Sequence, residues 1–273
     1  MCLYFDGATR LRCTHLGNIS KGQDGVIYDG CLFRFDSKGN CRVYDLQTLT
    51  ELSAFTLDQA DSLTPHSNSV SIRGNILYTN LYNTYAKEAD RKEGICCAYR
   101  ITRDGNIFHT ELVQVIRIGF AHTPLWQSEN GQDVRPYGNF VVEGDKLHAF
   151  VMRDESHSTR FFRFRLPDIT IPTVTLTEND IEAQFDESYV NYMQGAICHK
   201  GLIYSVEGFN HPNDRGRPAL RIFDTNRKKQ VFFADLVEYG LVSEPELVDV
   251  YEDQLYYADH AGNFYRLAFT GDT

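Results

Sequence analysis

The chain has little of what usually reveals a protein's chemistry. Among its 273 residues there is one Trp and there are three Met, and no two of its seven cysteines are spaced as CxxC. No HExxH, GxGxxG, GxxxxGK[ST] or GxSxG motif occurs, so the usual signatures of zinc peptidases, dinucleotide-binding folds, P-loop NTPases and α/β-hydrolases are missing. The nine histidines include no HxH or HxxxH pair. Short motifs therefore name no reaction for this chain.

Positive charge is also scarce. The chain has 27 Lys and Arg against 37 Asp and Glu, a net charge of −10. Binding of nucleic acid or of an anionic membrane needs a local excess of cations, so neither partner is expected. The one basic stretch, RFFRFRLP at residues 160–167, alternates Arg with Phe and is typical of a strand with one solvated face.

Long apolar runs are missing as well, and we expect no signal peptide. No window approaches 18 apolar residues, and the start, MCLYFDGATRLRCTH, lacks a cationic segment followed by an apolar one. An odd number of cysteines favours free thiols in a reducing compartment. We therefore expect a cytoplasmic protein.

Aromatic residues, at 13%, are abundant and lie in short runs with β-branched neighbours, which favours strands. One pattern occurs five times: an apolar run, a turn containing Gly or Asp, and a second run with Leu or Ile before an aromatic residue or His. Each copy reads as a β-hairpin. The copies are QDGVIYDGCLF from Gln23, NSVSIRGNILY from Asn68, GNFVVEGDKLH from Gly138, QGAICHKGLIY from Gln194 and ELVDVYEDQLY from Glu246.

Further runs align after these hairpins. A third run follows all five (CRVYDL, CCAYRI, FFRFRL, LRIFDT, NFYRL), and a fourth follows the first four (ELSAFTL, IFHTELVQVIRI, ITIPTVTL, KQVFFADL). The last unit lacks a fourth strand, which the alternating segment RLRCTHLGNI near the N-terminus can supply. This predicts an all-β fold: one five-bladed β-propeller domain over 1–273, with four-stranded antiparallel blades and the N-terminal strand completing the last blade. The predicted blades cover about 23–57, 68–118, 138–177, 194–236, and 246–269 plus 10–19.

A β-sandwich is the competing interpretation. It explains the alternation of apolar and polar residues, but neither the fivefold register nor the unit shared between the two ends of the chain. The propeller is the better prediction.

Propeller geometry also locates a site. The predicted loops on one face are tight, whereas the segments 58–67, 83–94, 119–137, 154–159, 178–193, 209–218 and 237–245 are long and gather on the other face. Polar residues that enter the inner strands, or end the second strands, meet at that mouth of the central channel. They are Gln23, Asp24, His66, Asn68, Arg135, Tyr137, Arg153, Gln194, Glu207, Glu244, Glu246, Asp259 and the adjoining His260.

This ring of carboxylates, amides, Arg, His and Tyr suits a polar small molecule, and it leaves a channel-bound cation such as Ca²⁺ open. Hydrolysis of a glycosidic bond needs two flanking carboxyl groups, for which Asp24, Glu207 and Glu246 are the candidates. His66 is the candidate for orienting them or transferring a proton. Gln23, Asn68, Arg135, Tyr137, Arg153, Gln194, Glu244 and Asp259 are the candidate ligand-binding residues.

In outline the chain resembles known five-bladed propellers: arabinanase-like glycoside hydrolases, a class of invertebrate lectins, and calcium-dependent nucleotidases. In arabinanase-like enzymes an Asp at the start of the first inner strand is the general base, and a Glu in a later blade is the general acid. The resemblance implies these roles for Asp24 and Glu207. The chain departs from that pattern in the third blade, where Gly138 and Asn139 replace a further Asp.

Two functions follow from the sequence. The first is binding, and in its stronger form hydrolysis, of a carbohydrate-like ligand at the long-loop mouth. The alternative is a non-catalytic scaffold that presents the same face to a protein partner, with loop aromatics as anchors. The candidate anchors are Tyr82, Tyr85, Trp126, Tyr189 and Phe209.

Overall fold

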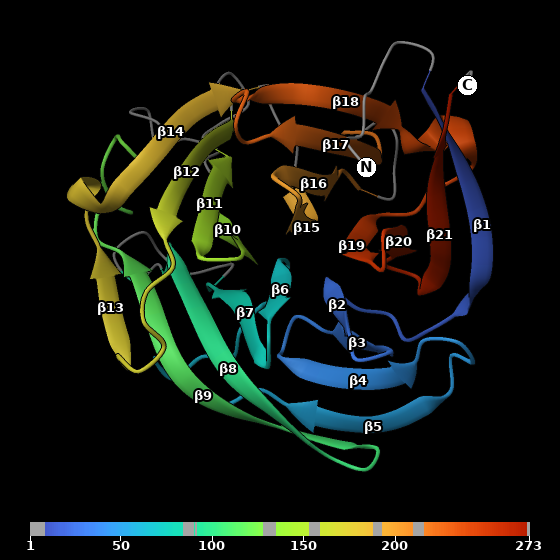
Figure 1. Ribbon diagram of the computed structural model, residues 1–273, viewed down its shortest axis with the longest axis horizontal. Helices are drawn as coiled ribbons and strands as arrows, with labels where there is room; N and C mark the ends of the chain where they lie inside the picture. The colour runs from blue at the N-terminus through green and yellow to red at the C-terminus, as the bar shows by residue number, and fades with distance from the viewer. Residues whose placement is uncertain are drawn as a thin grey trace.

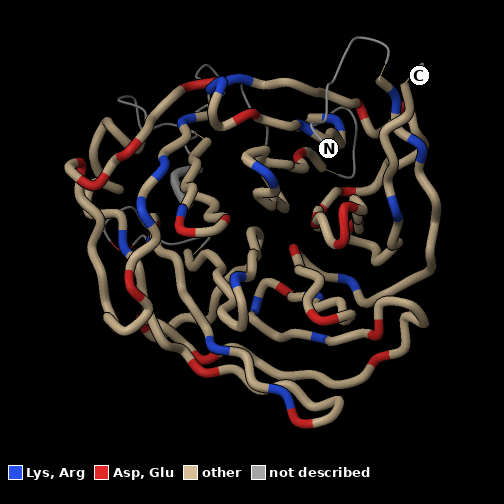
Figure 2. The backbone as a smooth tube through the Cα atoms, viewed as in Figure 1, with Lys and Arg blue, Asp and Glu red and all other residues tan. Residues whose placement is uncertain are grey.

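Five twisted sheets stand side by side around a central axis, as Figure 1 shows for the computed structural model. The structure describes residues 9–83, 90, 92–127, 135–152, 159–187, 193–209 and 216–271, with only the backbone for 135–137. The predicted five-bladed β-propeller is confirmed, and the β-sandwich is wrong. Charged residues of both signs are interspersed around the ring (Figure 2).

Each blade is built outward from an inner strand. Blade 1 contains β2 (Gly25–Tyr28), β3 (Cys31–Phe35), β4 (Asn40–Asp45) and β5 (Glu51–Thr56). Blade 2 contains β6 (Val70–Arg73), β7 (Ile76–Leu81), β8 (Ile95–Asp104), β9 (Ile107–Ile118) and β13 (Thr173–Leu176). Blade 3 contains β10 (Arg135–Glu143), β11 (Lys146–Met152), β12 (Thr159–Arg165) and β14 (Ile181–Glu187).

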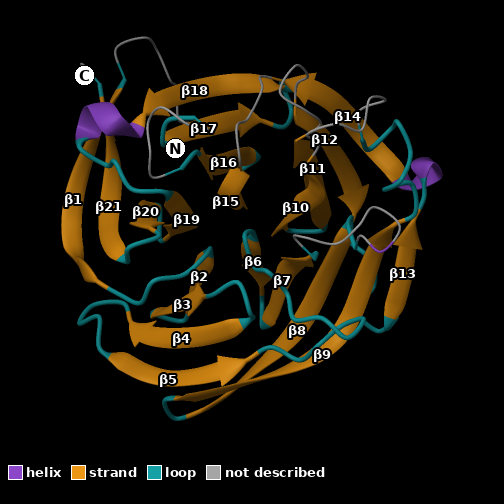
Figure 3. Ribbon diagram, turned by 180° about the vertical axis from the view of Figure 1, so that it is seen from behind, coloured by secondary structure: helices purple, strands orange, loops and turns teal. Residues whose placement is uncertain are grey.

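Blade 4 contains β15 (Met193–His199), β16 (Leu202–Glu207), β17 (Ala219–Asp224) and β18 (Lys229–Asp235). Blade 5 contains β19 (Pro245–Tyr251), β20 (Gln254–Asp259), β21 (Asn263–Thr270) and β1 (Arg10–Asn18). The 3₁₀ turns η2 (Glu178–Asp180) and η3 (Leu236–Tyr239) lie at the outer edge of the ring (Figure 3). No helix in the described ranges is long and apolar enough to span a membrane, and the six described cysteines are free thiols.

The two ends of the chain close the ring together. Strand β1 pairs antiparallel with β21, so that Leu11 lies opposite Phe269 and Cys13 opposite Leu267. The N-terminal strand thus completes the last blade, as predicted. This closure pairs the edge of β21, which would otherwise offer free N–H and C=O groups.

The prediction for the fourth run of the third unit was wrong. The segment ITIPTVTL does not form the outer strand of blade 3, because its β13 part pairs in parallel with β9 of blade 2, with Val174 opposite Ile116. The Gln114 amide holds the approach to β13, donating to the carbonyls of Asp168 (2.7 Å) and Ile171 (2.8 Å). The outer strand of blade 3 is β14, in the segment 178–193 that was predicted as a loop.

Aromatic side chains fill the spaces between blades 2, 3 and 4. Trp126 is fully buried, stacking on Phe162 with ring centroids 5.6 Å apart. Between blades 3 and 4, Phe161 packs against Phe185 and Phe223, both at 4.7 Å. These contacts set the blades rigidly around the channel.

Polar side chains of one blade satisfy the free N–H groups of the next inner strand. The Ser69 hydroxyl accepts from the N–H of Phe140 at 3.0 Å, and Asp249 Oδ2 accepts from the N–H of Ile27 at 2.6 Å. The inner strands also approach closely: a Cβ atom added at Gly195 would lie 2.2 Å from the carbonyl oxygen of Glu246. Blades 4 and 5 are therefore tightly packed against each other at this point.

Candidate functional site

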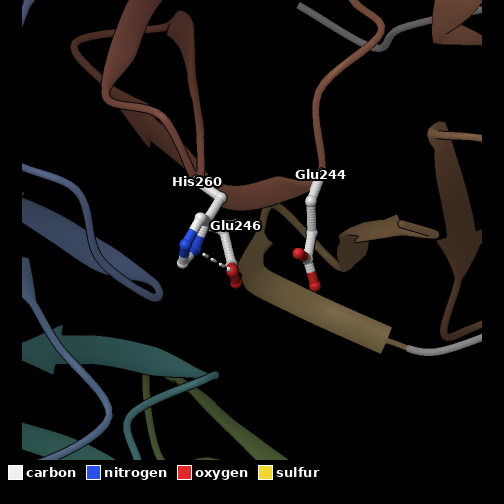
Figure 4. Close-up of side chains that lie close together, drawn as sticks. All are labelled: Glu244, Glu246 and His260. Atoms are coloured by element: carbon white, nitrogen blue, oxygen red, sulfur yellow. Dashed lines mark hydrogen bonds and ion pairs between the residues drawn. The ribbon is translucent and has the colours of Figure 1, made fainter. Parts of the chain in front are cut away.

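Five polar side chains from blades 1, 4 and 5 meet at the mouth. Figure 4 shows three of them, Glu244, Glu246 and His260, with their side chains turned toward one another. Glu246 lies in β19 and Glu244 just before it, and residues two apart on an extended chain share one face. His260 follows β20, whose last residue pairs with Pro245. Gln23 and Gln194 complete the group.

Glu246 is the centre of the group. Its Oε1 atom accepts from Gln23 Nε2 at 3.3 Å and lies 3.1 Å from His260 Nδ1. The second oxygen, Oε2, is buried and has no hydrogen-bond partner among the described residues. Glu244 accepts from Gln194 Nε2 at 2.7 Å, and its carbonyl accepts from the backbone N–H of His260. Glu246 is thus held firmly on one side and open to a further partner on the other.

Burial sets the charge of this group. Burial raises the pKa of Glu246 from 4.5 to about 7, although the hydrogen bond with His260 works against the rise. The same hydrogen bond raises the pKa of His260 above 6.5, against the opposing effect of its partial burial. Burial also raises the pKa of Glu244. Near pH 7 the site can therefore both hold and release a proton.

Arg34 supports the site from below. This side chain on β3 is 1% exposed, and its Nη2 donates to the carbonyls of Gly22 at 3.0 Å and Asp259 at 2.8 Å. The next residues along the chain are Gln23 and His260, the two that contact the central carboxylate. One guanidinium group therefore fixes the backbone before both contacts, across the seam between blades 1 and 5.

Arg34 also brings a buried positive charge close to the carboxylates. Burial lowers its pKa, and the nearby charges of Glu246, Asp24 and Asp259 oppose that effect. Its Nε and Nη1 atoms are buried with no hydrogen-bond partner in the described part of the chain. Unsatisfied buried groups of this kind usually bind internal water or a ligand.

The donor atoms also bear on metal binding. One carboxylate oxygen each from Glu244 and Glu246, and one His260 nitrogen, lie within 4.8 Å of one another. Calcium takes about six to eight oxygen ligands, so this set fits Ca²⁺ poorly. Two carboxylates and an imidazole suit a zinc-type cation better, but Arg34 opposes any added positive charge.

Asp24 lies deeper than the mouth. It is fully buried, and its Oδ2 accepts from the backbone N–H groups of Val70 (2.9 Å) and Ala196 (3.3 Å), which belong to blades 2 and 4. Burial raises its pKa well above the usual range. The structure places this carboxylate as a link between inner strands, with Oδ1 lacking a partner in the ranges described.

Glu207 and Asp259 bind neighbours in their own blades. Both oxygens of Glu207 accept from Arg221 Nε, at 2.9 and 3.0 Å, in a nearly buried ion pair. Asp259 accepts from the backbone N–H (2.9 Å) and the side-chain amide (2.7 Å) of Asn263, and so closes the β20–β21 turn. Among the contacts described for Glu207 and Asp259, none links their side-chain carboxylates to Glu246.

Asn68 and His66 belong to a second cluster, at blades 2 and 3. Asn68 accepts from Asn80 at 3.0 Å and from the Tyr82 hydroxyl at 2.8 Å. His66 stacks on Tyr82 with ring centroids 4.5 Å apart, and burial lowers its pKa to about 4. A neutral imidazole stacked on tyrosine holds the loop before β6 in place.

Three predicted site residues have no described side chain. Arg153 lies outside the described residues, and Arg135 and Tyr137 are described only as backbone in β10. Of the nine predicted site residues whose side chains are described, four come together at the mouth: Gln23, Gln194, Glu244 and Glu246.

Two further residues complete the site. His260 was predicted at the mouth but was given no role. Arg34 was missed, although an Arg inside the otherwise apolar strand CLFRF signals a buried charge that needs partners.

Two of the predicted aromatic anchors are buried, not exposed on the loops. Trp126 is fully buried against Phe162, and Tyr82, which is only 9% exposed, stacks on His66, so neither lies open on the loop surface. Phe209 is half-buried, and Tyr85 and Tyr189 lie outside the described residues.

Comparison with known proteins shows the fold. No family model matches the chain, and no curated protein matches its sequence. A solved structure, the glutaminyl cyclase of Myxococcus xanthus, is similar over 97% of both chains, with a TM-score of 0.58 and 13% sequence identity.

Two more solved structures match at a TM-score of 0.38. BamB from Moraxella catarrhalis matches 92% of this chain and 59% of its own at 9% identity, and the computationally designed Ika8 protein matches 94% and 98% at 8%. The likeness to the cyclase at this identity shows a common fold.

Proposed function

We propose that the chain binds a small polar molecule rich in hydroxyl or amino groups, such as a carbohydrate, at the mouth around Glu246. In this proposal Glu246 and His260 exchange a proton with the ligand. One observation carries it: a buried carboxyl group with a pKa of about 7 touches an imidazole through one oxygen and leaves the other without a partner in the described structure. Such a group is suited to general acid–base catalysis near neutral pH.

The neighbouring groups define what the ligand offers. Glu244 is a second acceptor beside Glu246, and Gln23 and Gln194 supply amide groups from two other blades. Acceptors that converge from three blades favour a ligand with several O–H or N–H donors.

Glycoside hydrolysis has weaker support than binding. Retaining glycosidases hold two carboxyl groups about 5 to 5.5 Å apart on either side of the scissile bond. Oxygens of Glu244 and Glu246 lie within 4.8 Å, but they come from one face of one strand segment and would approach a ligand from the same side. Proton transfer to a ligand held above them suits this geometry better.

The Myxococcus xanthus structure adds one further ligand class to test. It is described as a glutaminyl cyclase, so this fold can carry an enzyme. A peptide beginning with glutamine has the amino and amide donors that the mouth would accept. The scaffold alternative has less support, because the aromatic residues Tyr82 and Trp126 are buried.

A ligand screen tests the proposal. Thermal shifts are measured with sugars, polyols and glutamine-initiated peptides, and turnover is followed with chromogenic glycosides and the same peptides, with and without a chelator. The Glu246→Gln variant should lose the response to any ligand found, whereas Asp249→Asn should keep it. Asp249 is the matched control because it is a buried carboxyl group on the same strand, with its pKa also raised by burial to about 7. An equal response in both variants would remove Glu246 from the site.

A further inference from the structure

A groove of about 770 Å³ lies between blades 4 and 5. The turns that join β15 to β16, β17 to β18 and β19 to β20 surround it. Because adjacent antiparallel strands reverse direction, these turns lie at the opposite ends of the strands from Gln194 and His260. The groove is thus separate from the mouth, on the opposite face of the ring. Its volume is that of a small-molecule site, about 300 to 1,000 Å³.

The floor of the groove is apolar. Leu255 and Leu267 of blade 5 are nearly buried there, while Leu202, Val231 and Val250 are only partly buried and still present apolar surface. Toward the mouth the same two blades pack tightly through a continuous hydrophobic cluster. The blades separate at this end, where an apolar body could replace water favourably.

One polar group lies in this floor. Tyr204 lines the groove and is 2% exposed, and its hydroxyl has no hydrogen-bond partner within the ranges that the structure describes. Burial raises its pKa to about 12, and the charges of Cys198 and Asp253 contribute to that rise. No hydrogen bond to a described residue uses this hydroxyl, so it is available as a donor to a ligand.

The carboxylates at the rim are already bound by neighbours. Asp253 pairs with Lys200, and with His199 Nε2 at 3.2 Å. Asp224 accepts from the two backbone N–H groups at 226 and 227, both at 2.9 Å. These acidic groups have little capacity left for a cationic ligand.

The rim cations are less fully engaged. Lys229 is exposed and forms no ion pair with any residue that the structure describes, and Arg227 reaches Asp224 only at 3.4 Å. Together with Lys200, three cations stand against the carboxylates of Asp224 and Asp253. On a chain with a net charge of −10, this rim is a local site of positive charge.

We propose that the groove between blades 4 and 5 binds a small amphipathic anion. An apolar body would lie on the Leu255 and Leu267 floor, the Tyr204 hydroxyl would donate to a polar atom of the ligand, and a carboxylate, sulfonate or phosphate group would meet Lys229 and Arg227. This site is independent of the proposed function at the mouth.

Two probes with the same aromatic body test the charge requirement. 8-Anilinonaphthalene-1-sulfonate is anionic, and N-phenyl-1-naphthylamine lacks the sulfonate. Fluorescence titration of the folded chain should show one site per chain for the anion, and binding of the neutral probe about tenfold weaker. Equal affinity for both probes would overturn the proposal.

Matched variants locate the site. Lys229→Glu should weaken the anionic probe about tenfold and leave the neutral probe within about twofold. Lys228→Glu makes the same charge change next door at an exposed residue that does not line the groove, and should leave both probes unaffected. Ala268→Trp should fill the groove and abolish both, with folding checked by circular dichroism. Unchanged anion binding in Lys229→Glu, or equal losses in Lys228→Glu and Lys229→Glu, would refute the assignment even if Ala268→Trp does not fold.

Discussion

The wild-type protein should lose stability as pH rises toward 8, because Glu246 is buried, and Glu246→Gln should remove this loss. A carboxyl group with a pKa of 4.5 in the unfolded chain and about 7 in the folded protein is protonated in both states at low pH, so its contribution is then fully present. As pH rises from 4.5 toward 7, the carboxyl group ionises in the unfolded chain but stays protonated in the folded protein, so the folded state loses up to about 3 kcal/mol of stability. Most of this loss, about 2 to 3 kcal/mol, falls between pH 5 and pH 8.

The assay is urea unfolding of wild type and variant at pH 5, 6, 7 and 8. The difference in free energy of unfolding, variant minus wild type, should rise by about 2 to 3 kcal/mol over this range. Any constant cost of the buried amide cancels in that change. A difference that varies by less than about 1 kcal/mol would refute burial of an ionisable Glu246.

Asp249→Asn separates stability from function. Burial raises the pKa of Asp249 from 3.8 to about 7, so the same assay should show a rise of about 2 to 3 kcal/mol between pH 5 and pH 8. Both variants should thus gain relative stability with rising pH, while only Glu246→Gln loses ligand binding at the mouth. Loss of ligand binding in both would show that the mouth responds to changes anywhere along β19.

Three further variants test the packing around the site. Trp126→Ala should lower the free energy of unfolding by about 3 to 5 kcal/mol in urea titrations, because it empties a fully buried position between blades 2 and 3. Gly195→Ala should lower the melting temperature, because the new Cβ would lie 2.2 Å from a backbone carbonyl oxygen, and overpacking of this kind costs about 1 to 3 kcal/mol. Arg34→Met should cost about 3 kcal/mol at pH 8 and less at pH 5, where protonated carboxyl groups no longer need its charge. Equal losses at both pH values would show that Arg34 acts through packing alone.

The propeller could be predicted because the sequence pattern of each blade lies within a short segment of the chain. Each hairpin carries its own alternation and its own turn, so five copies reveal five units without any knowledge of their packing. The exception, β13, is decided by contacts that are distant in sequence: Gln114 on β9 binds the carbonyls of Asp168 and Ile171. A short apolar run beside a proline is consistent with pairing on either of two blades, and only those contacts choose between them.

For the site, the sequence predicts the face of the propeller on which it lies, but not the contacts between its residues. Strand direction places residues at the mouth, but it does not say which partner each carboxylate takes. Glu207 binds Arg221, fourteen residues later on the adjacent strand, and is thereby removed from the group at the mouth. Arg34 was missed because alternation predicts whether a position is buried, and not which backbone carbonyls a long side chain reaches.

Two buried carboxylates three residues apart on β19 show why Glu246 is the better functional candidate. Asp249 accepts two backbone N–H groups, those of Ile27 at 2.6 Å and Val250 at 2.8 Å, so its burial is offset by closure of the seam between blades 5 and 1. Glu246 accepts no backbone N–H in the described structure and leaves one buried oxygen without a partner. Burial raises the pKa of both carboxyl groups to about 7, so both lower the stability of the folded protein at neutral pH. Only for Asp249 do backbone hydrogen bonds offset this loss. The burial of Glu246 lowers stability at neutral pH and is not offset by backbone hydrogen bonds. A carboxyl group of this kind, beside an imidazole at the channel mouth, is typical of a residue that serves binding or proton transfer.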